Sequence, residues 1–494
     1  MRDGFKGASA VAFCLVILSM CLPVSGQSTH WNAAGGDWSA DANWTDGEPV
    51  AGIDAYVGSA GGRSTAAVTI VQAGEECRDL YLGDGEGNDG TLTIEPGGCL
   101  TADWLYVGLV GSGTVQQNGG ACNLTRLTVG YSERWDLPTP GEGTFELLDG
   151  NLDVGYISVA PTDMSSGQFT QRGGTITTTG MQVGSPWSGW LGEFHLIDGR
   201  LINSGYLALD QRGLFRQSGG YHQVRGLSLT FPLQYDKPGG ELVVTQNFGM
   251  WGGGFFTQWG GVTHVFGDLT VDGMGNLHIY GGSLHVDGNM LIAKEQYDLP
   301  DIDFLNPDGN VIVGGTLTLR GGIELQCGVG TQLHLRGRGF VNELPGTVGL
   351  YGYNKLAVVY EGGPGLVATY EAAGEDMGPD PNGFIENFTI GSLLVGGEDD
   401  IGKLRLVDDF ENTPGHALPE AVYVEHLLVG PGCTLDLNGL NLYYLTGTVD
   451  PAATVDRNGG SLIRVPEPAT LALLALGALA ATRRRPRLTP GVRH

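Results

Sequence analysis

A short repeated motif constrains the fold of this chain more than any other feature of its sequence. The motif is Gly-x-apolar-x-Gln-x-Gly-Gly, and its full copies occupy residues 113–120, 167–174, 213–220 and 254–261. Related copies occupy residues 90–98, 143–150, 192–199, 275–282 and 315–322. Successive copies between residues 90 and 213 begin 21–30 residues apart. A unit this short cannot bury its apolar side alone, so it has to stack on its neighbours.

The motif and the segment after it alternate apolar and polar residues, which is the period of a β-strand with one buried face. Gly accounts for 85 of the 494 residues, and Gly-Gly and Asp-Gly fall where the chain has to turn. We therefore predict an all-β chain that forms a right-handed parallel β-helix, or solenoid, with one repeat per rung. Inward Phe and Val side chains are expected to stack along the axis, and the Gln side chains to form an amide ladder at one corner.

A β-propeller is the alternative fold, because its blades need about 40–50 residues. The steps from residue 167 to 213 and from 213 to 254 fit that length. The additional copies that begin between some of the full ones favour the shorter rung of a solenoid.

The ends of the chain differ from its repeats, as the caps of a solenoid do. Trp31, Trp38 and Trp44 are expected to cover the first rung as a hydrophobic cap. The predicted divisions are a signal peptide at 1–26, an N-terminal cap at 27–75, solenoid repeats at 76–339, an irregular insertion at 340–390, closing rungs with a cap at 391–464, and a sorting and membrane segment at 465–487.

The body of the chain is strongly acidic, with 19 Lys and Arg against 52 Asp and Glu in residues 27–464. Such a charge repels nucleic acid, so no nucleic-acid partner is expected. The five cysteines of the body are widely spaced and include no Cys-x-x-Cys, which argues against zinc and against a dense disulfide framework. Either one bridge links two of Cys77, Cys99 and Cys122, or the thiols are isolated. No metal site and no cofactor are predicted.

The first 26 residues have the three parts of a secretory signal peptide. Arg2 and Lys6 supply positive charge, residues 8–22 are apolar, and small residues precede a predicted cleavage between Gly26 and Gln27. The chain is therefore expected to be exported.

The C-terminus combines three further elements in a fixed order: Val465, Pro466, Glu467 and Pro468, an apolar run at 469–482, and the cluster Arg483, Arg484 and Arg485. The apolar run is predicted to be a hydrophobic helix, short for a stable membrane span. The Arg cluster is expected to stay on the cytoplasmic side, which leaves the body outside the inner membrane. A plain tail anchor is the alternative.

This order resembles the PEP-CTERM sorting signal of Gram-negative bacteria. The resemblance covers about residues 465–487 and implies that a membrane enzyme, exosortase, recognises Pro466, Glu467 and Pro468 and processes the tail. The tail would hold the chain in the inner membrane transiently through residues 469–482. The entry segment, residues 31–49, resembles the start of passenger-like β-helical surface proteins, similar to autotransporter passengers.

No catalytic constellation stands out in the body, and we predict that the chain is not an enzyme. Its carboxylates follow turns and exposed strand faces, and the sequence has no nucleophile elbow, phosphate loop or His-Glu-x-x-His motif. Exposed indoles can stack on sugar rings, and the candidates for such contact are Trp187, Trp190, Trp251 and Trp259.

The sequence thus predicts an exported structural or adhesive protein, anchored in the inner membrane before processing and then held at the cell surface or in the extracellular matrix. Exopolysaccharide is the expected partner there. The alternatives are a glycan-binding module and a polysaccharide lyase or hydrolase built on a β-helix.

Overall fold

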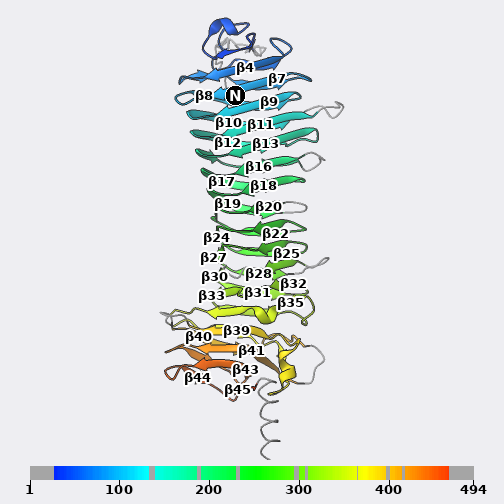
Figure 1. The fold of residues 1–494 in the computed structure, drawn as a ribbon, viewed down its shortest axis with the longest axis vertical. Coiled ribbons are helices and arrows are strands. Elements are labelled where there is room, and N and C mark those ends of the chain that lie inside the picture. The colour runs from blue at the N-terminus through cyan, green and yellow to red at the C-terminus, as the bar shows by residue number, and fades with distance from the viewer. Residues whose placement is uncertain are drawn as a thin grey trace, which may run out of the picture.

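The molecule is a rod of stacked β-strands (Figure 1). The computed structural model describes residues 27–132, 140–185, 191–229, 234–293, 300–305, 310–363, 365–396, 401–413 and 418–466. These residues wind into a parallel β-solenoid of about 17 turns, with almost no helix. The predicted solenoid is confirmed. The β-propeller alternative is wrong, because each turn pairs in parallel with the next one along the rod rather than forming separate four-stranded blades.

The described strands form two long sheets, of which one runs the length of the rod and the other ends at residue 351. The 14-stranded sheet contains β2 (Gly35–Asp37), β4 (Thr65–Ile70), β7 (Asp89–Ile94), β9 (Ser112–Gln117), β11 (Gly141–Leu147), β13 (Ser165–Gln171), β16 (Gly192–Leu196), β18 (Gly213–Gln217), β20 (Gln234–Lys237), β23 (Phe255–Gln258), β26 (Asn276–Ile279), β29 (Asp301–Phe304), β32 (Glu324–Cys327) and β35 (Leu350–Tyr351).

The 31-stranded sheet receives the rest of each turn. Its strands up to residue 293 are β1 (Ser28–His30), β3 (Asp54–Ser59), β5 (Glu75–Glu76), β6 (Asp79–Asp84), β8 (Cys99–Leu109), β10 (Ala121–Tyr131), β12 (Asn151–Val159), β14 (Thr175–Thr178), β15 (Met181–Val183), β17 (Arg200–Leu209), β19 (Tyr221–Leu229), β21 (Glu241–Val244), β22 (Phe248–Trp251), β24 (Val262–Val265), β25 (Leu269–Asp272), β27 (Ser283–Val286) and β28 (Met290–Ala293).

The same sheet continues to the C-terminal end of the rod. Its remaining strands are β30 (Asn310–Val313), β31 (Thr316–Arg320), β33 (Gln332–Leu335), β34 (Gly339–Glu343), β36 (Ala357–Tyr360), β37 (Ala368–Glu371), β38 (Gly374–Glu375), β39 (Ile390–Val395), β40 (Lys403–Val407), β41 (Glu420–Val429), β42 (Thr434–Asp436), β43 (Asn441–Val449), β44 (Thr454–Asp456) and β45 (Ser461–Arg464). Three short 3₁₀ helices interrupt the described strands: η1 (Asp41–Asn43), η2 (Tyr353–Lys355) and η3 (Pro381–Phe384).

The register of the 14-stranded sheet follows the sequence repeat. The glycines that begin successive copies lie side by side on neighbouring strands, in the order Gly90, Gly113, Gly143, Gly167, Gly192 and Gly213. One repeat is therefore one turn, even though its length varies from 21 to 30 residues. The extra residues of the longer repeats are accommodated between the strands.

A stack of aromatic rings fills the interior of the middle turns. The rings of Phe145, Phe169 and Phe194 are parallel and fully buried, with centroids 4.7 Å apart at each step. Phe215 and Tyr235 continue the stack at 5.0 and 4.7 Å. Burial of each ring contributes about 1.5–3 kcal/mol, and the stacking adds about 0.5–1.5 kcal/mol. The predicted inward ladder is confirmed, and it packs beside ladders of aliphatic residues such as Val159, Val183 and Leu209.

The glutamines of the motif lie at a corner of the solenoid, fully buried, but they do not form the predicted amide ladder. Gln171 lies between Leu147 and Leu196 on the neighbouring strands, so no amide stacks on it. Its Nε2 donates instead to the carbonyl oxygen of Arg200 in the next turn, at 3.0 Å. Gln217 likewise reaches Glu241 O at 2.8 Å. Each Gln therefore donates to backbone carbonyl oxygens at its own corner rather than to another amide.

The last glycine of each motif is required by this corner. Gly120, Gly174, Gly220 and Gly261 have φ between 63° and 72°, which L side chains rarely adopt. A Cβ at Gly261 would lie 2.1 Å from the carbonyl oxygen of Gly240 in the preceding turn. Glycine is therefore required at this position for two reasons, the positive φ and the lack of space for a Cβ beside the preceding turn.

The N-terminal end of the rod is closed by the three predicted tryptophans. Trp31 and Trp38 are fully buried, and both contact Trp44 edge to face with centroids 5.0 Å apart. Trp44 Nε1 donates to the carbonyl oxygen of Trp38 at 2.8 Å. This arrangement confirms the hydrophobic cap. All five cysteines of the body are free thiols, so of the two alternatives the isolated thiols hold.

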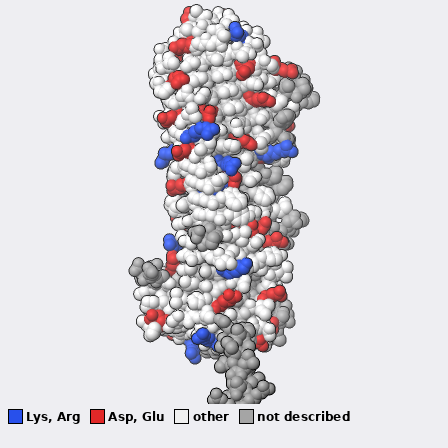
Figure 2. Space-filling view, in the orientation of Figure 1, with Lys and Arg blue, Asp and Glu red and all other residues white. Residues whose placement is uncertain are grey.

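The outer surface is mostly uncharged or acidic. Figure 2 shows Asp and Glu scattered along the face that it draws, with fewer Lys and Arg. Within the described part of the chain, no helix is long and apolar enough to cross a membrane. The predicted C-terminal hydrophobic helix, at 469–482, lies outside the described residues.

Candidate functional site

The last turn of the solenoid leads directly into the C-terminal motif singled out in the sequence. Strand β45 pairs in parallel with β43, and the next residue, Val465, donates its N–H to the carbonyl oxygen of Tyr444 at 2.7 Å. Val465 is fully buried, whereas Pro466 is exposed and is the last described residue. No linker therefore separates the folded rod from the motif.

Val465 belongs to a second apolar cluster, on the outside of the closing turns. The cluster contains Ala421, Tyr423, Tyr443 and Val465, whereas the alternating residues Val422 and Leu442 point into the main core. The rings of Tyr423 and Tyr443 stack with centroids 4.8 Å apart. Phe384 packs edge-on against Tyr423 at 5.1 Å. The start of the motif is thus held by side chains that cover the outer face of the sheet.

A loop that we name the terminal brace, residues 374–389, covers this outer cluster. Its Asp376 accepts hydrogen bonds from the Tyr443 hydroxyl and from Asn441 Nδ2, both at 2.7 Å. The Tyr423 hydroxyl accepts from Met377 N–H at 2.9 Å and donates to Gly378 O at 3.1 Å. Burial, together with the Asp376 carboxylate, raises the pKa of the Tyr443 hydroxyl. It therefore stays protonated and donates at neutral pH.

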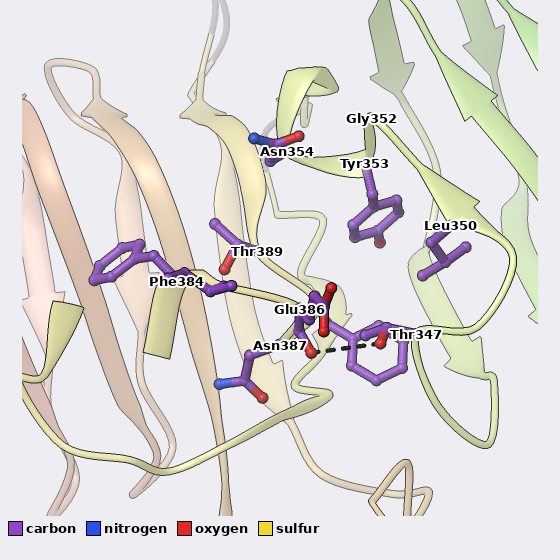
Figure 3. Close-up of a pocket in the computed structure, with 11 residues that line it drawn as sticks. Thr347, Leu350, Gly352, Tyr353, Asn354, Phe384, Glu386, Asn387 and Thr389 are labelled. Atoms are coloured by element: carbon purple, nitrogen blue, oxygen red, sulfur yellow. Dashed lines mark hydrogen bonds between the residues drawn. The ribbon is translucent and has the colours of Figure 1, made fainter. Parts of the chain in front are cut away.

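A pocket of about 310 Å³ lies between the terminal brace and the turns around η2 (Figure 3). Its lining is Thr347, Leu350, Gly352, Tyr353, Asn354, Phe384, Ile385, Glu386, Asn387, Phe388 and Thr389. Phe384 is shared between this pocket and the outer cluster, so the pocket borders the end of the rod where the motif begins.

Backbone strain is concentrated in one wall of this pocket. Glu386 and Phe388 have φ of 50° and 54°, a conformation that costs a non-glycine residue about 1–3 kcal/mol. The Thr347 hydroxyl donates to Glu386 O at 3.4 Å, the contact drawn in Figure 3. Asn387 Nδ2 donates to Glu375 O at 3.0 Å and to Gly383 O at 3.1 Å. Glu386 is the sole carboxylate among the lining residues, so the pocket does not pair an acid with a base.

Two buried carboxyl groups lie close to the terminal brace. Glu371 Oε1 accepts from Asp409 N–H at 2.6 Å and from Phe410 N–H at 2.8 Å. Glu420 Oε1 accepts from Asn412 N–H at 2.7 Å and from Thr413 N–H at 3.0 Å. Burial raises the pKa of each to about 7. Both groups hold the 408–413 loop against the sheet through hydrogen bonds to its backbone.

Two of the four predicted glycan-contact tryptophans lie within the described residues, and both are exposed. The exposed fraction is 42% for Trp251 and 57% for Trp259. They lie at opposite ends of strand β23, so they do not form one platform. Trp259 instead pairs with Tyr280 of the next turn, with ring centroids 4.5 Å apart. Trp187 and Trp190 lie outside the described residues.

The remaining predicted site residues are mostly outside the described range. Gln27 is described and exposed, whereas Gly26 is not described. Glu467, Pro468, Arg483, Arg484 and Arg485 also lie outside it. The sequence did not indicate the terminal brace, because Asp376 and Tyr443 are far apart in the chain and belong to no repeat.

The fold and its C-terminal end define a class: a parallel β-solenoid whose last turn passes without a linker into a C-terminal segment. Comparison with known families identifies that segment. Residues 464–485 match the family model described as the PEP-CTERM protein-sorting motif, so the chain carries this motif and is an exported protein. The motif is a recognition signal for exosortase. No curated protein and no solved structure matches the chain.

Proposed function

We propose that this protein is a structural or adhesive rod of the cell surface or extracellular matrix. The observation that carries the proposal is that one chain combines a long solenoid with a sorting motif that begins at the last strand of that solenoid. A stack of similar turns with a continuous core supplies reach and rigidity. Exopolysaccharide is the partner that we propose for the rod in its final location.

The proposed route begins with an inner-membrane intermediate held through residues 469–482. Exosortase then processes the tail near Pro466, Glu467 and Pro468, and the body moves to the cell surface or beyond. Intact-mass measurement after cell fractionation tests this route. We expect the recovered surface protein to lack residues 1–26 and the tail beyond about Pro466.

The variant that tests this route is the double substitution Glu467→Ala and Pro468→Ala in one chain. It should keep its tail and accumulate in the inner membrane, whereas Asp456→Ala, an exposed acidic change at the same end of the rod, should be processed normally. An unprocessed wild-type tail in the inner membrane would leave a tail-anchored solenoid and contradict the proposed route.

The structural role is tested by changing the length of the rod. Gly167 and Gly213 occupy equivalent register positions two turns apart, so deletion of residues 167–212 removes two turns and keeps the pairing. This variant should be exported but should attach cells or matrix less well. A deletion that is one residue longer, 167–213, would move the following strand by one register position, reverse its faces and should not fold. Unchanged attachment by the shortened rod would count against a role that depends on length.

Glycan binding is the second candidate function, and the exposed pair of Trp259 and Tyr280 favours it. Aromatic faces of this kind stack on sugar rings. Retention on immobilised exopolysaccharide should fall in Trp259→Ala but not in Phe266→Ala, which removes an exposed ring beyond the opposite end of the neighbouring strand β24. Equal retention of all three proteins would exclude this platform.

We further propose that the chain has no catalytic activity. Glu371 and Glu420, whose pKa burial raises to about 7, bond to loop backbone rather than converge on a cleft, which supports this view. Release of oligosaccharides from a polysaccharide panel, abolished by a single carboxylate substitution, would instead assign a lyase or hydrolase.

A further inference from the structure

Three potential metal-binding side chains meet on the outer face of the 14-stranded sheet. His278 on β26 lies directly opposite Asp303 on β29, and Asp301 precedes Asp303 by two residues on the same strand. The intervening residues Ile302 and Phe304 are buried in the core. Because side chains alternate along a strand, all three polar groups point away from the core on one face.

The geometry of the three groups is compact. One ligand atom from each of His278, Asp301 and Asp303 can be chosen so that all lie within 4.8 Å of one another. His278 Nε2 is 3.5 Å from Asp301 Oδ2. This nitrogen is shielded from solvent, and no described residue forms a hydrogen bond with it. A buried nitrogen with a lone pair or proton to satisfy is expected to have a partner.

A neighbouring tyrosine orients one of the carboxylates. The Tyr280 hydroxyl donates to Asp303 Oδ2 at 2.7 Å. Outer hydrogen bonds of this kind fix the ligands of metal sites in place.

Elsewhere on the same face, a carboxylate is paired with an arginine. Asp236 lies opposite Arg216, with Nε and Oδ2 3.4 Å apart. Asp303 instead lies between His278 and Gln326, and the next turn adds Glu324 opposite Asp301. Among the described residues, no Lys or Arg forms an ion pair with Asp301 or Asp303. Within the described residues, the concentrated negative charge therefore has no Lys or Arg paired with it.

We propose that His278, Asp301 and Asp303 bind a divalent transition-metal ion, represented by Zn²⁺, on the outside of the rod. One imidazole nitrogen and two carboxylate oxygens form a mixed ligand set that suits such an ion better than Ca²⁺, which prefers six to eight oxygens. Three protein ligands leave at least one position for water or for a group from a partner. Trp259 and Tyr280 lie beside the site and would flank such a group.

Isothermal titration of the untagged mature protein, first stripped with a chelator, tests the site with Zn²⁺ or Ca²⁺ alone. We expect one equivalent of Zn²⁺ to bind and Ca²⁺ not to bind. His278→Asn and Asp303→Asn should each abolish this equivalent, and Tyr280→Phe should weaken it by about tenfold. If one variant does not fold by circular dichroism, Asp301→Asn replaces it.

The matched control is His195→Asn. His195 lies on the same face with one carboxylate, Glu193, at 3.4 Å, but its strand neighbour is Arg216. The Nε2 of His195 is also buried without a hydrogen bond. His278 therefore differs from His195 in having a second carboxylate nearby and no arginine opposite it on the next strand. Loss of binding in the control, retention in both ligand variants, absence of Zn²⁺ binding, or binding of Ca²⁺ in its place would each overturn the proposal.

Discussion

The middle turns of the rod and its closing turns use the same sheet but are stabilised differently. Between residues 140 and 293, stabilisation lies inside, in the aromatic stack and the buried corner glutamines. From residue 365 to 466, the interior is mostly aliphatic, with Tyr370 and Phe388 as its aromatic members, and a second cluster with the terminal brace covers the outside. Repetition thus builds length in the middle, whereas non-repeating contacts between distant residues secure the end that carries the sorting motif.

Lys237 provides a contrast within the middle turns themselves. It occupies the corner position of Gln217 and Gln258, and its Nζ donates to the carbonyl oxygens of Gly240 and Gly260, each at 3.0 Å. Where this corner position is polar, an ammonium can therefore replace the amide as the hydrogen-bond donor. Burial lowers the pKa of Lys237 to about 7, because a charged ammonium is poorly solvated there.

The largest effect is expected from Phe194→Ala, which interrupts the aromatic stack. Loss of a buried ring should cost about 3–5 kcal/mol, and hydrogen exchange should increase first in β13, β16 and β18. Gln168→Ala, an outward change on β13, should cost less than about 0.5 kcal/mol. Similar losses in the two variants would show that the stack does not hold the middle turns together.

Lys237→Gln should change how stability depends on pH. The folded-state pKa lies below the unfolded value, so the unfolded chain binds more protons between about pH 7 and pH 10, and wild-type stability should rise over that window by about 2–4 kcal/mol. The variant should lack this rise and be the more stable protein near pH 7. Denaturant unfolding at pH 7 and 10 measures both, with the exposed Lys403→Gln as control. A parallel rise in the Lys237 variant would contradict the burial argument.

Glu420→Gln tests the closing turns, where the stability of the wild type should fall rather than rise with pH. The folded-state pKa, about 7, exceeds the usual value, so the stabilising contribution of this group is complete below about pH 4.5 and is lost as pH rises through 7. Gln keeps an acceptor for Asn412 N–H without a charge and should gain about 1–3 kcal/mol at pH 8. Hydrogen exchange of residues 401–413 at pH 5 and 8 measures this, with the exposed Glu411→Gln as control. Equal exchange in the variant and the wild type at pH 8 would exclude the effect.

Tyr443→Phe should have the smallest and most local effect. It removes the hydrogen bond to Asp376 and should cost about 0.5–1.5 kcal/mol. Protease cleavage within the terminal brace should become faster while the middle turns stay protected. Tyr444→Phe, for which no hydroxyl bond to a described residue is recorded, is the matched control. Faster cleavage throughout the rod would show that the two regions are coupled.

The repeat predicted the solenoid because each copy contributes the same strand with an apolar side chain, such as Val115 or Phe169, at the same inward position. It did not predict how Gln171 is bonded, since its partner is a carbonyl in the next turn and not another copy of itself. The terminal brace was also missed, because its contacts join positions that are far apart and unrepeated. The cluster at His278 was missed for a different reason. His278 and Asp303 are 25 positions apart in the sequence, and only the strand register shows that they lie opposite each other on successive turns.

Burial of Val465 beside exposed Pro466 has a mechanical consequence. A flexible linker before the motif would let the rod swing freely about its attachment. Here the match to the sorting motif begins at Arg464, which is the last residue of strand β45, and Val465 after it is fully buried. Torque applied to the far tip is therefore transmitted through the whole shaft to the boundary at Pro466. An enzyme that reads the motif would therefore meet the folded shaft directly before Glu467, because the described chain is packed up to Val465.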